Sequence, residues 1–474
     1  MPQSPTVSLP KRLPLILEPE NRDESTRYDS KIINGYVEHN QTTDEYWIYK
    51  RPGLTVYNTF SGIGYGICNW QGIIYSIFGG TFYQGSLPIA SVDTTGGTYH
   101  FSASLGDTPR LQLGNAVTAY NWDNVSLKQM SGVNFPGNIY PAAPVKGWAY
   151  LDGTTYILDA TAYVHGSDSA PGMNRPDLWD DYLNLIGAQI EPDRGVFLAK
   201  QLVYVIVMKE WSTEVFYDAL NPVGASPLAP VQGAKINYGC ISGESVQELD
   251  GTLIWLATNR SSAVQVVRLD NLKPMVISTK AIERLLGEAD FSAVASFTVK
   301  YEGHRFYGVT LKNDNLTLVY DMTDQRWAQW TSSTGDYFKA VSSTFLGGTG
   351  HLLQHETDGK IYKMDASSLT DAGELITVDL YTPNFDGGVR RRKQMTMQEF
   401  IADQVSGSSI QVRVNDYDYD PTKWTVFRTV DLSVRKPVLV NCGTFMRRAT
   451  HIRHAAATRF RLQAIEMQLD LGTL

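Results

Sequence analysis

Short apolar runs separated by turn residues dominate this chain, and residues 297–330 show the pattern most clearly. Runs rich in aromatic and β-branched residues are separated there by Glu302-Gly303 and by the polar segment 312–315, and a further turn follows at 324–325. Strands of this length, joined by such short turns, predict an antiparallel meander.

Related units recur along the chain. They start about 35–50 residues apart, which is the period of four-stranded propeller blades. Steps such as Asp152-Gly153 and Asp250-Gly251 favour hairpins, because these turns need a positive φ that glycine adopts freely. We therefore predict that six or seven blades close a ring from about residue 50 to about residue 370. The units span residues 62–84, 99–122, 145–158, 195–217, 245–269, 297–330 and 338–364.

Two segments interrupt the strand pattern, and both predict short helices. Residues 174–188 have Pro176 at an early helical position and apolar residues on one face. Residues 279–288 have Thr279 as the N-cap and Ile282 on the face that packs inward.

A polar linker after Asp365 is followed by a second group of alternating strands, which is typical of a β-sandwich. We predict an all-β protein in three parts. Residues 1–45 supply N-terminal strands that join the platform, residues 46–370 form a six- to seven-bladed β-propeller, and residues 371–474 form a C-terminal β-sandwich platform domain.

Composition narrows the class further. At 474 residues the chain exceeds one ordinary core, and 11% aromatic residues with 40 Gly favour strands and tight turns. No apolar run is long enough to span a membrane, and the Pro-broken N-terminus does not resemble a signal peptide, so we expect a protein made in the cytosol without processing. Cys68, Cys240 and Cys442 are too scattered for a disulfide framework or a zinc site, and we expect buried thiols.

The net charge of −8 is unevenly distributed. Residues 389–461 hold fourteen Lys and Arg against six Asp and Glu, whereas the rest of the chain is acidic. Such asymmetry predicts a surface for an acidic protein or nucleic acid, and the alternative is a solvated sheet face covered by basic side chains. The candidate interface residues are Arg390, Arg391, Arg392, Lys393, Arg447, Arg448, Arg453 and Arg459.

Catalytic motifs are absent from the sequence: no phosphate loop, dinucleotide fingerprint, zinc-protease motif or nucleophile elbow occurs. We predict no catalytic residue, cofactor or metal site. His351 and His355 lie in a strand, where their spacing does not bring them together, and the acidic segment 416–420 favours a turn over a calcium loop. We interpret His304 as a hydrogen-bonded residue that fixes a blade turn.

An ordered set of short motifs gives a specific resemblance over residues 211–365. In their order and spacing they resemble the packaged-DNA stabilisation, or tail hub (nozzle-type), family of short-tailed bacteriophages. The segment after Lys423 resembles the closing domain of that family more loosely, and before residue 200 the recognisable motif is the Arg51-Pro52-Gly53 turn. The specific motifs occupy residues 212–216, 239–241, 276–283, 301–307, 319–321 and 326–327.

The resemblance implies a propeller joined to a β-sandwich platform in a virion structural protein of the phage tail, without catalysis. It also implies a homo-oligomer, typically a hexamer, that forms a ring below the portal and adaptor proteins. Such a ring closes the DNA exit channel, retains the packaged DNA, allows transient passage of double-stranded DNA and docks tail fibre or spike proteins. The basic candidate residues would then face the adaptor.

The alternative function is a β-propeller glycan-binding protein or glycoside hydrolase. Propeller glycosidases hold two carboxylates about 5–10 Å apart over the central channel, and this sequence singles out no such pair. The uneven charge and the lack of a recognisable signal sequence favour the tail protein.

Overall fold

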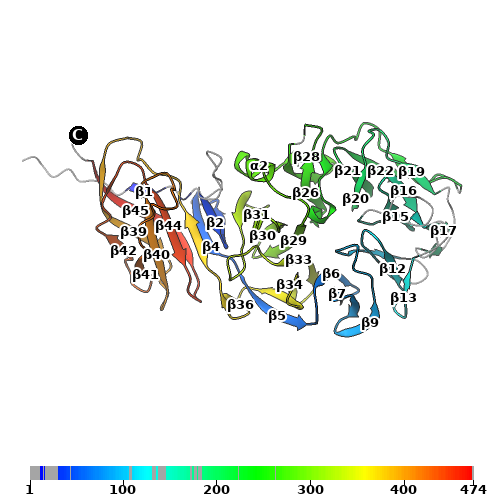
Figure 1. Cartoon of the computed structure of the whole chain (residues 1–474), viewed down its shortest axis with the longest axis horizontal. Coiled ribbons are helices and arrows are strands. Elements are labelled where there is room, and N and C mark those ends of the chain that lie inside the picture. Colours follow the sequence, from blue (N-terminus) through cyan, green and yellow to red (C-terminus); the bar gives the residue numbers. More distant parts are fainter. Residues whose placement is uncertain are drawn as a thin grey trace, which may run out of the picture.

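A computed structural model describes residues 11–13, 15, 30–42, 44–105, 109–130, 135–136, 146–170, 173–175, 179, 184–222, 224–261 and 263–471. The described chain is built almost entirely of β-strands, as predicted. A propeller lies at one end of an elongated molecule, and a second group of sheets lies at the other (Figure 1).

Six successive antiparallel sheets surround the centre of the propeller (Figure 1). The first two contain β6 (Gly64–Trp70), β7 (Ile73–Phe78), β8 (Thr81–Gln84), β9 (Leu87–Ser91), β10 (His100–Ser104), β11 (Arg110–Gly114), β12 (Ala119–Trp122) and β13 (Leu127–Gln129). The third and fourth contain β14 (Ala149–Leu151), β15 (Thr154–Leu158), β16 (Tyr163–Gly166), β19 (Leu185–Gly187), β20 (Gly195–Gln201), β21 (Tyr204–Lys209), β22 (Thr213–Asp218) and β23 (Leu228–Pro230). The fifth and sixth contain β24 (Gly239–Cys240), β25 (Gln247–Leu249), β26 (Thr252–Thr258), β27 (Gln265–Asp270), β28 (Lys273–Val276), β29 (Val294–Tyr301), β30 (His304–Leu311), β31 (Leu316–Asp321) and β32 (Arg326–Gln329).

A further sheet closes the ring with a strand from the N-terminal part of the chain. It contains β33 (Ala340–Leu346), β34 (Gly350–His355), β35 (Lys360–Asp365), β5 (Gly53–Thr59), β36 (Thr370–Asp371) and β37 (Glu374–Leu375). Strand β5 pairs antiparallel with β35, so the two ends of the propeller sequence are hydrogen-bonded to each other. Because β33 also packs against β6, the last sheet meets the first, and the predicted six- to seven-bladed propeller is confirmed.

The hairpin turns have the conformation that their residues predict. Asp152 and Gly153 have φ values of 45° and 92°, and Asp250 and Gly251 have values of 54° and 75°. Two consecutive positive φ values are the mark of a type I′ turn, whose twist matches that of the strands that it joins. The Asp-Gly steps therefore set the register of the blades.

One predicted helix is confirmed and the other is not. Helix α2 (Lys280–Gly287) begins after Thr279, whose hydroxyl accepts the N–H of Ile282. The second helix is predicted over residues 174–188. Residues 174 and 175 instead belong to β18 (Met173–Arg175), and residues 185–187 form β19. Most of the segment between these strands lies outside the described residues. Strand β18 pairs with β17 (Asp168–Ala170), and β19 completes the third sheet by pairing with β16, so strand pairing overrides the helical pattern at both ends.

Two sheets at the other end of the molecule, which we call the platform, combine strands from both ends of the chain. One is an extension of the sixth propeller sheet. Beyond β32 it contains, in order, β2 (Lys31–Ile33), β38 (Val378–Tyr381), β44 (Ala449–His454), β40 (Ser409–Asn415) and β41 (Arg428–Asp431). The other contains β3 (Gly35–Asn40), β4 (Glu45–Lys50), β45 (Arg461–Leu471), β39 (Lys393–Ala402) and β42 (Val438–Val440), with β1 (Lys11–Leu13) on β45 and β43 (Thr444–Phe445) on β39. The N-terminal strands thus pair with C-terminal ones, and β4 continues to Lys50.

Both platform sheets contribute to one hydrophobic core. Ile32 and Ile452 from one sheet belong to the same buried cluster as Phe400 and Ile465 from the other. The guanidinium of Arg428 on β41 donates hydrogen bonds to the carbonyl oxygens of Val440 and Asn441. These bonds join the edge strand of one sheet to the edge of the other.

Arg51 lies buried where the platform meets the propeller. Its guanidinium donates two hydrogen bonds to the carboxylate of Asp371, at 2.9 and 2.5 Å, and a third to the carbonyl of Thr331 at 3.1 Å. Its Nε donates to the side-chain oxygen of Asn34 at 3.0 Å. Arg51 therefore links the loop before β5, the segment after β32 and the closing sheet of the propeller.

Asn34 and Gly53 complete this junction. The side chain of Asn34 accepts the N–H of Thr331 and donates to the carbonyl of Thr377, which leads into β38. A Cβ atom on Gly53 would lie 2.3 Å from the carbonyl oxygen of Thr370. The chain therefore needs glycine after Arg51-Pro52 because another backbone segment packs directly against that position.

We predict that replacing Arg51 with Met will lower the free energy of unfolding by about 3–5 kcal/mol, because the half-buried carboxylate of Asp371 and the side-chain oxygen of Asn34 lose their partner. Arg51→Lys should recover only part of this loss, since one ammonium cannot reproduce the planar fork. Urea unfolding followed by tryptophan fluorescence measures the change. Arg390→Met, at an exposed position, is the matched control and should change stability by less than about 0.5 kcal/mol. Equal effects of the two Met variants would contradict the role given to Arg51.

Candidate functional site

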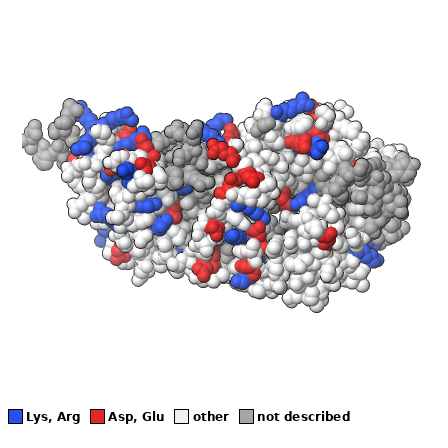
Figure 2. Space-filling view, viewed as in Figure 1, with Lys and Arg blue, Asp and Glu red and all other residues white. Residues whose placement is uncertain are grey.

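Three of the predicted interface arginines, Arg390, Arg391 and Arg392, are exposed in the loop between β38 and β39. Arg447, which is half-buried, lies close to this loop, since Lys393 binds the carbonyl oxygens of both Arg391 and Met446. The loop leads into β39, which lies in the half of the molecule away from the propeller (Figure 1), and Figure 2 shows several Lys and Arg side chains in that half. The structure thus brings together four of the eight predicted residues.

Lys393, predicted on the same surface, is instead buried. Its ammonium donates to the carbonyl oxygens of Val389, Arg391 and Met446, at 2.5–3.0 Å. Burial lowers the pKa of this ammonium. Lys393 is therefore unavailable to a partner, and it holds the loop that presents the three exposed arginines.

Arg448 and Arg453 are occupied by carboxylates within the platform. The guanidinium of Arg448 is buried and makes a bidentate pair with Asp416, at 2.7 and 2.8 Å. Arg453 donates to Asp379 at 2.8 Å. Burial raises the pKa of that carboxyl, but the hydrogen bonds with His451 and Arg453 hold it below its usual range. The acidic segment 416–420 thus binds arginines, with Arg447 contacting Asp418.

Arg459 faces the propeller. It lines a pocket of about 220 Å³ that also includes Tyr301 and Glu302 from the sixth sheet. The eight basic residues therefore do not form one surface. Arg448 precedes β44, Arg453 lies within it and Arg459 follows it, and none of these three lies in the loop that carries Arg390, Arg391 and Arg392.

A second surface lies on the propeller, where exposed apolar residues occupy the turns on one face. Neighbouring turns on this face are linked around the ring: the hydroxyl of Tyr150 donates to Leu105, and Gln201 donates to Gly251. The exposed residues at or next to these turns are Ile73, Leu87, Leu105, Val125, Leu202, Val203 and Leu220. We call this set the apolar turn face.

Two of these residues adopt a conformation that leucine seldom takes. Leu202 and Leu220 each have a φ of 53°, and their side chains are 58% and 84% exposed. Glycine or asparagine adopts this positive φ at a lower energetic cost than leucine. The conformation of the turn therefore does not explain why leucine occupies these positions. Rules that predict turns from Gly, Asn, Asp and Pro do not detect these positions, because leucine is not a typical turn residue.

The surrounding surface is poor in charge. Between residues 54 and 127 the sequence contains only Asp93, Asp107, Arg110 and Asp123 as charged side chains. The region of β6 to β13 is correspondingly almost white in Figure 2. Depletion of charge together with exposed apolar side chains is the composition of a protein–protein interface core.

The centre of the propeller contains a cavity of about 330 Å³ lined mainly by the inner strands of the sheets. Glu244 is its central charged group: its carboxylate pairs with the ammonium of Lys146 and lies 3.5 Å from Nε2 of His100. Burial, with a smaller effect of Lys146, lowers the pKa of His100 to about 3.

Sequence reasoning did not single out Glu244 or Lys146, because each is an isolated charged residue between apolar strands. The ion pair joins the segment before β14 to the segment before β25, and the carbonyl of Glu244 accepts a hydrogen bond from Ser296 on β29. These contacts connect three sheets across the cavity. They account for the pair as a structural element of the ring.

The fold is a propeller joined to a platform, with an exposed arginine loop on the platform and the apolar turn face on the propeller. The family model described as "Bacteriophage P22 Gp10, beta-propeller" matches residues 26–369. The chain therefore belongs to this phage packaged-DNA stabilisation and tail family, and it is a structural protein of a phage virion. No curated protein matches the sequence.

Solved structures with a similar chain path are distant. The N-terminal domain of Nup159 is 8% identical, with a TM-score of 0.39 over 70% of this chain and 97% of that one. Virginiamycin B lyase from Staphylococcus aureus is 11% identical, with a TM-score of 0.39 over 65% of this chain and 98% of that one. Such weak similarity carries no argument about function. No helix in the described part of the chain has the length and hydropathy of a membrane span.

Proposed function

We propose that this protein is a tail hub, or nozzle, subunit whose copies form a ring, a hexamer as in related proteins, below the portal and adaptor proteins. In this role the ring closes the DNA exit channel, retains the packaged genome and docks tail fibres or spikes. The supporting observation is the separation of two exposed surfaces: arginines in the loop before β39 of the platform and the apolar turn face on the propeller.

The exposed arginines support a contact with an acidic partner, which we take to be the adaptor. Arg390, Arg391 and Arg392 are exposed, and their loop is fixed by the buried ammonium of Lys393. A fixed loop loses little conformational freedom on binding, and planar guanidinium groups pair bidentately with carboxylates. Contacts of this kind mainly set the orientation and rate of association.

The apolar turn face supports a contact with a neighbouring copy of the same chain. Permanent interfaces between subunits are more apolar than transient ones and contain few charges at their centre. The turns that carry Leu87 and Leu220 meet this description, since both leucines are exposed and the surface near Leu87 has almost no charged residues.

The propeller is proposed to act without chemistry and to contact DNA only in passing. Residues 1–388 hold twenty-seven Lys and Arg against forty-one Asp and Glu, and like charge keeps a passing duplex from adhering. The carboxylate of Glu244 in the central cavity is paired with Lys146, so it is not a free acid or base. These observations favour a scaffold over the glycan-binding or glycosidase alternative.

We predict that changing Arg390, Arg391 and Arg392 together to Glu will weaken assembly onto the portal–adaptor complex by about tenfold or more at low salt. The effect should shrink as salt screens the charges. Assembly is measured by mass photometry over a salt series. A variant with Lys280 and Arg284 of helix α2 changed to Glu adds negative charge to the propeller away from the apolar turn face and should assemble normally. Unchanged assembly of the platform variant at both low and high salt would exclude the arginine loop.

We predict that Leu87→Arg and Leu220→Arg will each shift the ring toward monomers, because a buried unpaired charge at an apolar contact is costly. Native mass spectrometry, with and without the portal–adaptor complex, measures the distribution. Val426→Arg is the matched control, since Val426 on the platform is 83% exposed and Leu220 is 84% exposed. Rings of normal size in both leucine variants would contradict the assignment of this face.

We predict that the isolated protein will bind duplex DNA only weakly, and more weakly as salt rises, because net-negative walls release few counterions. It should also leave surface polysaccharides uncleaved. Fluorescence anisotropy with a labelled duplex and chromatography of treated polysaccharide test the two parts. Sub-micromolar affinity at physiological salt, or cleavage that disappears in Glu244→Gln, would favour the alternative function.

A further inference from the structure

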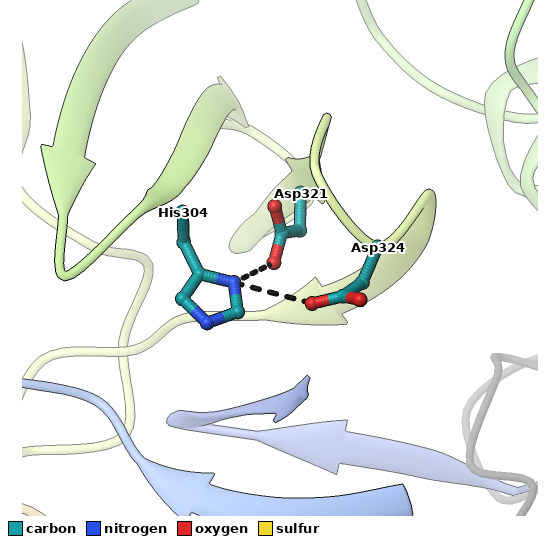
Figure 3. Close-up of side chains that lie close together, drawn as sticks. All are labelled: His304, Asp321 and Asp324. Atoms are coloured by element: carbon teal, nitrogen blue, oxygen red, sulfur yellow. Dashed lines mark hydrogen bonds and ion pairs between the residues drawn. The ribbon is translucent and has the colours of Figure 1, made fainter. Parts of the chain in front are cut away.

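A cluster of one histidine and two aspartates lies at the end of the sixth sheet where β30 begins and β31 ends, close to β3 of the platform (Figure 3). His304 begins β30 directly after the Glu302-Gly303 turn, Asp321 ends β31, and Asp324 lies in the turn before β32. Antiparallel pairing brings these turns to the same end of the sheet, since Tyr301 pairs with His304 and Asp321 with Arg326. The meander itself therefore assembles the cluster.

The two carboxylates face the same ring nitrogen. Nδ1 of His304 lies 2.6 Å from Oδ2 of Asp321 and 3.4 Å from Oδ2 of Asp324. The ligand atoms of the three side chains all lie within 4.8 Å of one another. One N–H on Nδ1 makes a well-formed hydrogen bond to only one of these oxygens. Because that N–H donates to Oδ2 of Asp321, Oδ2 of Asp324 has no well-formed hydrogen bond from the histidine.

Backbone groups hold both carboxylates in this orientation. Oδ1 of Asp321 accepts the N–H of Thr323 at 2.9 Å, and Oδ1 of Asp324 accepts the N–H of His39 at 3.3 Å. In each aspartate one oxygen is anchored and the other is directed at the imidazole. The side chains of His304, Asp321 and Asp324 are only 5%, 3% and 13% exposed, so water compensates little of their charge.

The opposite edge of the imidazole faces a third carboxylate. Nε2 of His304 lies 3.9 Å from Oε2 of Glu38, on platform strand β3. Metal-binding histidines commonly direct their second ring N–H at such a carboxylate, which fixes the tautomer. The ring of Tyr36 packs edge-on against the imidazole, and that of Phe306 stacks on it. The site therefore has a positioned donor atom and aromatic walls, and the carboxylate of Glu38 lies near the other ring nitrogen, beyond hydrogen-bond distance.

We propose that Nδ1 of His304 and the carboxylates of Asp321 and Asp324 bind one divalent transition-metal cation of the Zn²⁺ type, with the Nδ1 proton released to solvent as the cation takes its place. One imidazole nitrogen with two carboxylate oxygens is a donor set that such ions accept, and two carboxylates balance the charge of the cation. The ion connects the two turns of the sixth sheet. Through Glu38 and the N–H of His39, it also connects that sheet to β3 of the platform. The bound cation stiffens the junction between propeller and platform, a property separate from the proposed assembly function.

The test uses the untagged full-length chain, freed of metal with a chelator and then titrated with Zn²⁺ by calorimetry. Wild type should bind one Zn²⁺ per chain at this site, and Zn²⁺ should raise its Tm by several degrees. Asp324→Asn should weaken Zn²⁺ binding by about tenfold or more, because it removes a ligand charge. The variant keeps the shape of the side chain and an oxygen to accept the N–H of His39, so it should fold.

Asp358→Asn is the matched control. Asp358 pairs with His355 at 3.1 Å in the neighbouring sheet, but no second carboxylate among the described residues completes a group of three ligands with that pair. Zn²⁺ binding and the rise in Tm should survive in this variant. Absence of saturable Zn²⁺ binding to wild type, or equal binding to wild type and Asp324→Asn with normal circular dichroism, would overturn the metal site. His304 would then be an ion-pair partner of Asp321 alone.

Discussion

The buried guanidinium of Arg51 is the interaction on which the arrangement of the two halves depends. It binds Asp371 from the closing sheet, the carbonyl of Thr331 after β32 and the side chain of Asn34 before β3. Arg51 itself lies in the segment that leads from β4 of the platform to β5 of the propeller, and the segment after Asp371 leads back to β38 of the platform. A buried charge is tolerated only when all its hydrogen bonds are satisfied, so the junction has one well-defined geometry.

Strand exchange supports the same junction. Strand β5 from the N-terminal region completes the closing sheet, while β2 joins β32 of the propeller to β38 of the platform. The chain thus enters the platform, forms the propeller and returns to the platform. Because both ends of the propeller are held by hydrogen bonds to distant segments, forces on the platform are transmitted directly to the ring of sheets.

This rigidity suits a virion structural protein with contacts at two ends. The arginine loop is fixed by Lys393, and the apolar turn face consists of short turns rather than long loops. Surfaces of this kind bind without large ordering costs. The proposed tail ring needs repeated contacts of the same geometry, and a stiff connection between the two surfaces would favour them.

The sequence by itself determined the propeller, its hairpin turns and helix α2, because strand period, Asp-Gly steps and the Thr279 cap act locally. It also identified the basic C-terminal region and the Arg51-Pro52-Gly53 turn. Only the tertiary structure decided which basic residues are exposed, since Lys393 is buried by backbone carbonyls and Arg448 by Asp416. It likewise decided the strand pairings around residue 174, the partners of Arg51 and the grouping of His304 with the two aspartates. Those features depend on contacts between distant segments, which local patterns do not encode.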